Sequence, residues 1–346
     1  MSSDSNLFHA GEELEKEVFK LQGNRFVHKE ETYLPLYEGR MITHFDHRAS
    51  SVGVQTETTF RSGVTEETSS EEHRSATYPA MPRYWVAKDE VEDSKPDFHE
   101  YKWFTGFRDV TSTTNERTFV NSFLPYSGVG HKVPMMFTQE NAPYWGCLHA
   151  NISSFVLDYS TRQKLGGVSL TYYVIKQLPL HPPERYTPEL LEYIVPRVLE
   201  LAYTAWDLTA YADDVWSEAS VDLQSAIESQ WQANVEATGG GHRGKTPPEW
   251  VEHSDQADEH FPHSPFMWDE ERRRYLRADL DGLYGHLYGL EREELAYILD
   301  TFPIVKEQNE KECGEYRTKR LVLQAYDELE GTDMLHSSDR EKKEAP

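Results

Sequence analysis

Residues 117–124 have the sequence Arg-Thr-Phe-Val-Asn-Ser-Phe-Leu, which is rich in aromatic and β-branched residues. That composition, between turn residues, is typical of a β-strand. Three further runs of the same kind occur nearby, at residues 83–86, 101–105 and 133–137. Together they predict a domain with a substantial sheet over residues 82–185.

The sequence downstream has a helical pattern. Thr187-Pro188 combines an N-cap residue with a proline that is favoured in the first helical turn. Apolar residues then recur at helical spacing to Ala202, and Pro196 is expected to kink or restart this helix. Two more helices are expected over residues 268–290 and 291–301. We therefore predict a mixed α+β fold, a sheet-containing domain followed by a mainly helical region, 186–330, that includes a long loop, 218–265.

The flanking segments are assigned by composition. Residues 1–48 are expected to be a helical and linker segment, with a helix over 10–21 and a turn at Gly23-Asn24. Residues 49–81 are rich in Ser, Thr and Glu, and we expect a flexible excursion there. The polar residues 331–346 are expected to form a disordered tail.

The charge of the chain argues against nucleic-acid binding unless the charge is screened. The 346 residues include 60 Asp and Glu against 35 Lys and Arg, for a net charge of -25. Phosphate contact is electrostatic, so such a protein is normally a poor partner for DNA. The acidic residues are spread along the whole chain, however, which is typical of a salt-adapted surface. In 1 M salt the Debye length is only ~3 Å, so local basic clusters would then decide binding.

Several protein classes are disfavoured by what the sequence lacks. No stretch approaches the ~20 consecutive apolar residues of a membrane helix. The first ten residues have no basic segment followed by an apolar one, so no signal peptide is expected. Two cysteines are too few for a disulfide framework or a four-cysteine zinc site. We expect a cytoplasmic protein that does not associate with membranes.

Motifs for catalysis are incomplete. The chain has no phosphate-binding glycine loop and no Gly-x-Ser-x-Gly elbow. Asn141-Ala-Pro-Tyr144 is similar to the Asn-Pro-Pro-Tyr loop that holds a flipped adenine in N6-methyltransferases, but Ala142 interrupts it and no cofactor loop lies upstream. We therefore expect no catalytic residues and no cofactor bound by this chain.

Two short clusters could bind a metal. Asp89 or Asp97, with Glu100 and Lys102, has the residue types of a metal-dependent nuclease, although Asp97 and Glu100 are too close in sequence to converge from two strands. The segment His44-Phe-Asp-His47 offers imidazole and carboxylate ligands. Without a second cluster, an Asp that orients a His in a packed interface is the better interpretation. No metal site is expected.

Residues 151–180 contain the strongest candidate for phosphate contact. A helix is expected to begin after Ser153-Ser154, with Arg162 and Lys164 at its end, before Gly166-Gly167 leads into an apolar strand. Basic residues beside a glycine pair let the backbone approach phosphate closely. The same pattern is also typical of a simple helix C-terminus, where the dipole favours cations.

The run from Asp158 to Gly167, followed by Gln177-Leu-Pro179, resembles the end of the target-recognition domain of large adenine-specific restriction–modification methyltransferases. These are the type IIG/IIL, MmeI-like and PglX-like enzymes. The similarity extends in order over residues 6–328. Its other segments resemble the link after the methyltransferase domain, the entry to the recognition domain and the C-terminal helices: Leu36–Arg48, Pro82–Val86, Phe107–Thr118, Pro265–Arg273, Leu280–Leu290 and Ile298–Pro303.

The resemblance implies a DNA-recognition chain without its own catalytic core. A separate methyltransferase or restriction subunit would supply S-adenosylmethionine and methylate adenine N6 of double-stranded DNA. The implied DNA contacts are Arg108, Asn115, Arg117, Lys132, Arg162, Lys164, Gly166 and Gly167. The implied interface with the catalytic partner contains Tyr37, His44, Phe45, Asp46 and His47. A metal-dependent nuclease and an inactive fragment or protein-interaction subunit are the alternatives.

Overall fold

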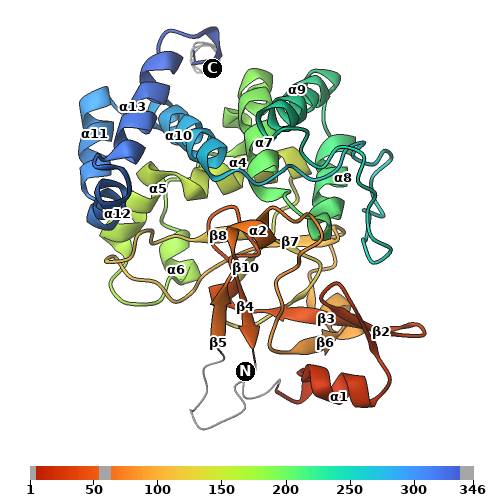
Figure 1. The fold of residues 1–346 in the computed structure, drawn as a ribbon. Coiled ribbons are helices and arrows are strands. Elements are labelled where there is room, and N and C mark those ends of the chain that lie inside the picture. Colours follow the sequence, from red (N-terminus) through yellow and green to blue (C-terminus); the bar gives the residue numbers. More distant parts are fainter. Residues whose placement is uncertain (1–4, 54–63, 336–346) are drawn as a thin grey trace.

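The computed structural model describes residues 5–53 and 64–335 (Figure 1). The mixed α+β class is confirmed: mainly antiparallel sheets occupy residues 20–136 and a mainly helical region follows over 142–335. Parts of two sequence expectations, residues 54–63 of the excursion and 336–346 of the tail, lie outside the described residues.

The first sheet is built on a hairpin near the N-terminus. The helix expected over 10–21 is shorter, because α1 (Gly11–Lys16) ends and the chain pairs instead across the turn at Gly23, where φ is +61°. The sheet contains β1 (Lys20–Gln22), β2 (Arg25–His28), β3 (Glu31–Tyr37) and β6 (Trp85–Ala87), with β9 (Gly128–Val129) parallel to β3. Residues 1–48 are therefore partly strand, not only helix and linker.

The second sheet joins the β region to the helices. It has the order β10 (Met135–Met136), β7 (Trp103–Phe107), β8 (Asn121–Pro125). Every residue of β7 and β8 is buried, as their aromatic sequences predict. Trp103 and Phe123 belong to the same apolar core as the helices, so this sheet and the helical region share one interior.

The segment 49–81 contains regular structure in its described part. β4 (Ser50–Gly53) pairs with β5 (Val64–Glu67) in an antiparallel hairpin, and the short helix α2 (Ser70–His73) follows. Ser69 caps α2 by accepting a hydrogen bond from the Glu72 backbone N–H. The segment has few apolar residues, so its sequence does not indicate strands. Backbone hydrogen bonds between β4 and β5 hold the hairpin together.

The helical region (Figure 1) contributes most residues of the apolar cluster that also contains Trp103 and Phe123. Its main helices are α4 (Ala142–Ser153), α5 (Phe155–Lys164), α7 (Pro188–Ala202), α8 (Thr209–Ser217), α9 (Val221–Ala237), α10 (Glu270–Leu287), α11 (Arg292–Asp300), α12 (Pro303–Cys313) and α13 (Arg317–Leu329). The shorter α3 (Lys88–Ser94) and α6 (Tyr172–Ile175) lie earlier in the chain. No helix in the described ranges combines the length and apolar character needed to span a bilayer.

Helix α9 corrects the expectation of a loop over 218–265. Ser220 caps it, and Leu223, Ile227 and Trp231 are buried at helical spacing. The irregular connection is therefore restricted to residues 238–269. Helix α7 also runs through Pro196, because burial of its apolar face outweighs one lost backbone hydrogen bond.

Helices α10 and α13 make a close contact in the C-terminal part of the fold. A Cβ atom at Gly282 would lie 2.7 Å from the Tyr326 backbone nitrogen, which is shorter than real Cβ contacts. Glycine at this position allows the two helix backbones to approach. This packing places the N-terminal half of α10, with its arginines, beside α12 and α13.

Candidate nucleic-acid interface

A cleft of about 710 Å³ lies where residues 108–120 face helices α10, α12 and α13. We call it the arginine cleft, because five arginines line it: Arg108, Arg117, Arg274, Arg277 and Arg317. Four carboxylates also line it: Glu116, Glu270, Asp281 and Glu312. The whole chain has a net charge of -25, whereas the lining of this cleft has more arginines than carboxylates.

A second hollow of about 360 Å³ adjoins the arginine cleft, and the two share Arg108 and Val110. We call it the adjoining pocket. Its other basic lining residues are Arg40, Arg83, His131 and Lys132, and its one acidic lining residue is Glu38. The two hollows together form a positively charged track along the sheet-to-helix junction.

Arg108 is the cation at the centre of this track. It follows β7, and its Nη2 donates a hydrogen bond to the Ile42 carbonyl. Its Nε is buried without a partner, and no described carboxylate is within ion-pair distance of its guanidinium. Burial lowers the pKa of Arg108 and the charge of Asp46 opposes this, but an arginine stays protonated at any physiological pH. Arg108 therefore has positive charge that no neighbouring carboxylate neutralises directly.

Arg117 has an internal partner. Its Nε donates to Asp158 Oδ2 at 2.7 Å, and the Asp158 carboxylate also accepts the backbone N–H groups of Thr118 and Phe119. Asp158 is fully buried. This ion pair fixes the loop that forms one wall of the cleft, so part of the Arg117 charge is already neutralised.

The Arg162 side chain is partly exposed and packs against other segments of this chain. It donates to the carbonyls of Asn115, Glu116 and Thr301, and its guanidinium lies 3.9 Å from the centre of the Phe302 ring. All of these contacts are within the chain. These contacts brace the Asn115 loop against the C-terminal end of α11, and phosphate contact by Arg162 stays a prediction.

The glycine pair lies outside both hollows. Lys164, Gly166 and Gly167 are exposed, and no atom lies within 4 Å of a Cβ built at either glycine. The expected apolar strand after Gly167 is absent, since the chain makes one bridge between Val110 and Ser169 and then forms α6. The predicted helix before it is confirmed, with Ser154 as the cap of α5.

Of the eight predicted DNA contacts, four line the two hollows: Arg108, Asn115, Arg117 and Lys132. Asn115 is exposed on the loop over the cleft, and Lys132 forms an exposed ion pair with Asp109 at 2.8 Å. Three arginines of the cleft were not predicted, Arg274, Arg277 and Arg317. The run Arg272-Arg-Arg-Tyr-Leu-Arg277 indicates two of them, because Arg274 and Arg277 are three residues apart and share a helix face.

The five residues assigned to a partner interface are buried inside this chain. Tyr37, His44, Phe45, Asp46 and His47 all have relative exposures of 9% or less. His47 Nε2 lies 2.8 Å from Asp207 Oδ1, and Asp46 Oδ2 lies 3.0 Å from His73 Nε2. Burial raises the pKa of Asp46, but the hydrogen bond from His73 and the nearby cations outweigh it and hold the pKa at about 2. In this conformation the segment contacts other parts of the same chain, and its contact with a catalytic partner stays a prediction.

His44 is the one member of this segment that lines the arginine cleft. Its Nε2 is buried without a partner. Burial, and next the charge of Arg117, lower the pKa of His44 well below its usual value. The ring is therefore neutral near pH 7 and does not add to the positive charge of the cleft.

The residues of the nuclease alternative form no ion pair with one another among the described residues. Asp89, Asp97 and Glu100 are exposed, and Lys102 lies near Glu92 and Asp255. Within residues 5–53 and 64–335, the group of side chains arranged to hold a metal is a different one, Asp213, His253 and His260. Sequence spacing does not indicate this group, because Asp213 is forty residues before His253.

No family model, curated protein or solved structure matches this chain. Functional inference therefore depends on the cleft and its charges. The arrangement can hold an anion by arginine hydrogen bonds beside the exposed amide of Asn115.

Proposed function

We propose that this chain binds double-stranded DNA along the arginine cleft and the adjoining pocket and acts as the recognition part of an adenine-N6 methyltransferase system. The observation that carries the proposal is Arg108, a cation that lines both hollows and has no carboxylate partner among the described residues. A guanidinium presents planar donors that match a phosphate, and such charge-assisted bonds are stronger than neutral ones.

Two other arginines of the cleft, Arg274 and Arg277, can exchange their glutamate partners for a phosphate. Arg274 pairs with Glu312 at 2.8 Å and Arg277 with Glu270 at 3.0 Å, and these glutamates are about half exposed. Ion pairs at such positions contribute only about 0–1 kcal/mol. A phosphate that arrives at the cleft can therefore replace a glutamate at little cost. This exchange would give the acidic chain a local DNA-binding surface.

Sequence recognition in this proposal involves the loop over the cleft. Asn115 is exposed there, and the asparagine amide matches the N6 and N7 edge of adenine. Phosphate contacts by Arg108 and Lys132 would position the duplex, while the loop reads base edges. The likeness of residues 158–179 to restriction–modification recognition domains supports a cytoplasmic role beside a catalytic subunit that binds S-adenosylmethionine.

Selection from a pool of randomised duplexes tests this function. The purified chain, immobilised in buffers from low to molar KCl, should retain duplexes and enrich a short common sequence over successive rounds. The same experiment with single-stranded pools is the control. If no duplex is retained at any salt concentration, DNA recognition is excluded. If the chain alone transfers methyl groups, the assignment of catalysis to a separate subunit is excluded.

The affinity for DNA should depend on pH through Asp281 in the cleft. Burial raises the pKa of this carboxyl to about 6, against the opposing charges of Arg117 and Arg277, and its Oδ1 accepts the Phe155 N–H at 2.8 Å. Asp281 is mostly neutral at pH 5 and charged at pH 7.5, while His44 stays neutral, so duplex binding should weaken about three- to tenfold over that range. Asp281→Asn keeps an acceptor for Phe155 and should remove most of this change, as measured by fluorescence anisotropy. An unchanged pH profile in the variant would contradict the assignment.

A further inference from the structure

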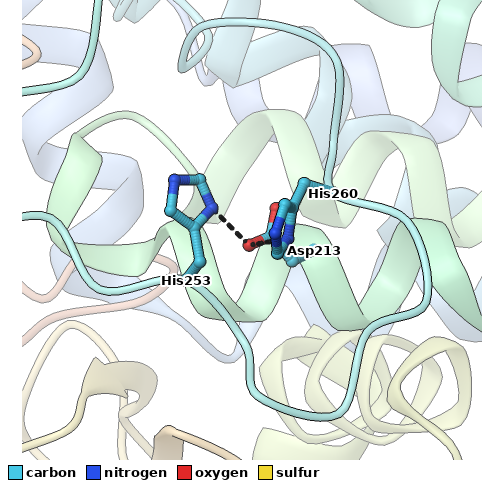
Figure 2. A group of neighbouring side chains, drawn as sticks. All are labelled: Asp213, His253 and His260. Atoms are coloured by element: carbon cyan, nitrogen blue, oxygen red, sulfur yellow. Dashed lines mark hydrogen bonds and ion pairs between the residues drawn. The ribbon is translucent and has the colours of Figure 1, made fainter.

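Two histidines from the irregular connection 238–269 converge on a carboxylate of α8 (Figure 2). His253 Nδ1 lies 2.7 Å and His260 Nδ1 lies 3.1 Å from Asp213 Oδ2. One ligand atom from each residue lies within 4.8 Å of those of the other two. We propose that Asp213, His253 and His260 form a site for a divalent transition-metal ion of the zinc class, with the fourth coordination position open to solvent.

The donor set and spacing fit such an ion. Two imidazole nitrogens and one carboxylate oxygen are typical ligands of Zn²⁺ in sites that keep an open position. Metal–ligand bonds of about 2.0–2.1 Å in a tetrahedron place ligand atoms roughly 3.3 Å apart. The nitrogen-to-oxygen distances of 2.7 and 3.1 Å would need to widen by about 0.6 and 0.2 Å.

The environment of Asp213 also points to a cation. Its side chain is fully buried, and no described lysine or arginine pairs with it. A buried carboxylate without a cationic partner is energetically costly, and a bound dication would offset this cost. The two histidine side chains are 41% and 53% exposed, so an ion can reach the site from solvent.

Backbone groups beside each histidine hold the carboxylate in place. The N–H of Ser254 donates to Asp213 Oδ2 at 3.2 Å and the N–H of Phe261 donates to Oδ1 at 2.9 Å. Outer contacts of this kind orient metal ligands. The ion would fasten the connection to α8. Because Glu252 of the same connection pairs with Arg25 of β2 at 2.8 Å, the ion would also stabilise the contact between the helical region and the first sheet.

Metal titration of the full chain tests the site independently of DNA binding. After EDTA treatment and desalting, the chain should bind one equivalent of Zn²⁺ by calorimetry, and Co²⁺ should give the visible absorption of a tetrahedral nitrogen–oxygen site. Mg²⁺ should not compete, because it prefers octahedral oxygen ligands. Zn²⁺ should raise the thermal midpoint by mass action.

His260→Gln is the decisive variant, because this exposed side chain can be replaced with little risk to folding. It should lower Zn²⁺ affinity at least about 100-fold and abolish the Co²⁺ spectrum. His263→Gln is the matched control on the same connection, since His263 interacts with Glu228 and Trp231 instead, and it should bind metal like the wild type. Absence of stoichiometric Zn²⁺ binding, or binding that is equal in the wild type and His260→Gln, would overturn the proposal.

Discussion

Replacement of Arg48 by methionine is expected to lower the free energy of unfolding by about 4 kcal/mol or more. The Arg48 side chain is fully buried. Its Nη1 donates to the carbonyls of Ser75 and Tyr78, and its Nη2 donates to those of His73 and Thr204 and to the Thr204 hydroxyl. Methionine fills similar space but leaves these buried acceptors without donors, each at a cost of about 1–3 kcal/mol before relaxation.

The contacts of Arg48 explain why the effect should be global. They connect the segment before β4 with residues 73–78 at the end of α2 and with Thr204 between α7 and α8, so their loss weakens the contact between the β region and the helical region. Urea unfolding followed by circular dichroism measures the change. Arg74→Met, at an exposed arginine just after α2, is the matched control and should change stability by about 0.5 kcal/mol or less. A cost below about 1 kcal/mol for Arg48→Met would contradict the assigned role of this side chain.

Replacement of Arg108 by methionine is expected to weaken duplex DNA binding about tenfold or more. The reason is that Arg108 is the cation shared by the arginine cleft and the adjoining pocket, and no described carboxylate neutralises it. Loss of one phosphate contact should weaken binding to all duplex sequences about equally and reduce the magnitude of the salt slope by about 1. Fluorescence anisotropy with a labelled duplex gives both quantities.

Two further variants separate charge from structure at this position. Arg108→Lys keeps the charge but loses the planar donors, so its affinity should lie between those of the wild type and Arg108→Met. Arg197→Met removes a partly buried arginine on α7 that pairs with Asp279 outside both hollows, and it should bind DNA like the wild type. Equal loss of affinity in Arg108→Met and Arg197→Met would show that the effect arises from instability and not from DNA contact.

The sequence predicted elements that are determined locally. Thr187 and Ser154 cap the helices they were expected to cap, and the aromatic runs at 101–105 and 117–124 contribute β7 and β8. Helix α9 does not follow from the sequence pattern, because the charges, the three glycines at 239–241 and the proline pair at 247–248 conceal its apolar face. Burial of Leu223, Ile227 and Trp231 against the core outweighs these local signals.

The candidate site was only partly predictable, because it depends on contacts between distant segments. The position of Arg162 beside a glycine pair predicts phosphate contact, but it does not show that the guanidinium also bonds to the carbonyls of Asn115, Glu116 and Thr301. The residue types of the 44–47 segment predict a packed interface, but they do not show that Asp207 of the same chain lies against it. Spacing along the sequence does not show which distant residues a side chain contacts in the folded chain.

The most direct test of the central claim is the salt dependence of duplex binding by the wild-type chain. Fluorescence anisotropy with a labelled duplex should be measured from about 0.1 to 1 M KCl, a range over which electrostatic contacts weaken progressively. If Arg108, Lys132 and the neighbouring arginines contact phosphates, the affinity should fall with a logarithmic slope between about -3 and -5. A chain that binds no duplex at the lowest salt concentration, or whose affinity does not change with salt, would contradict the account.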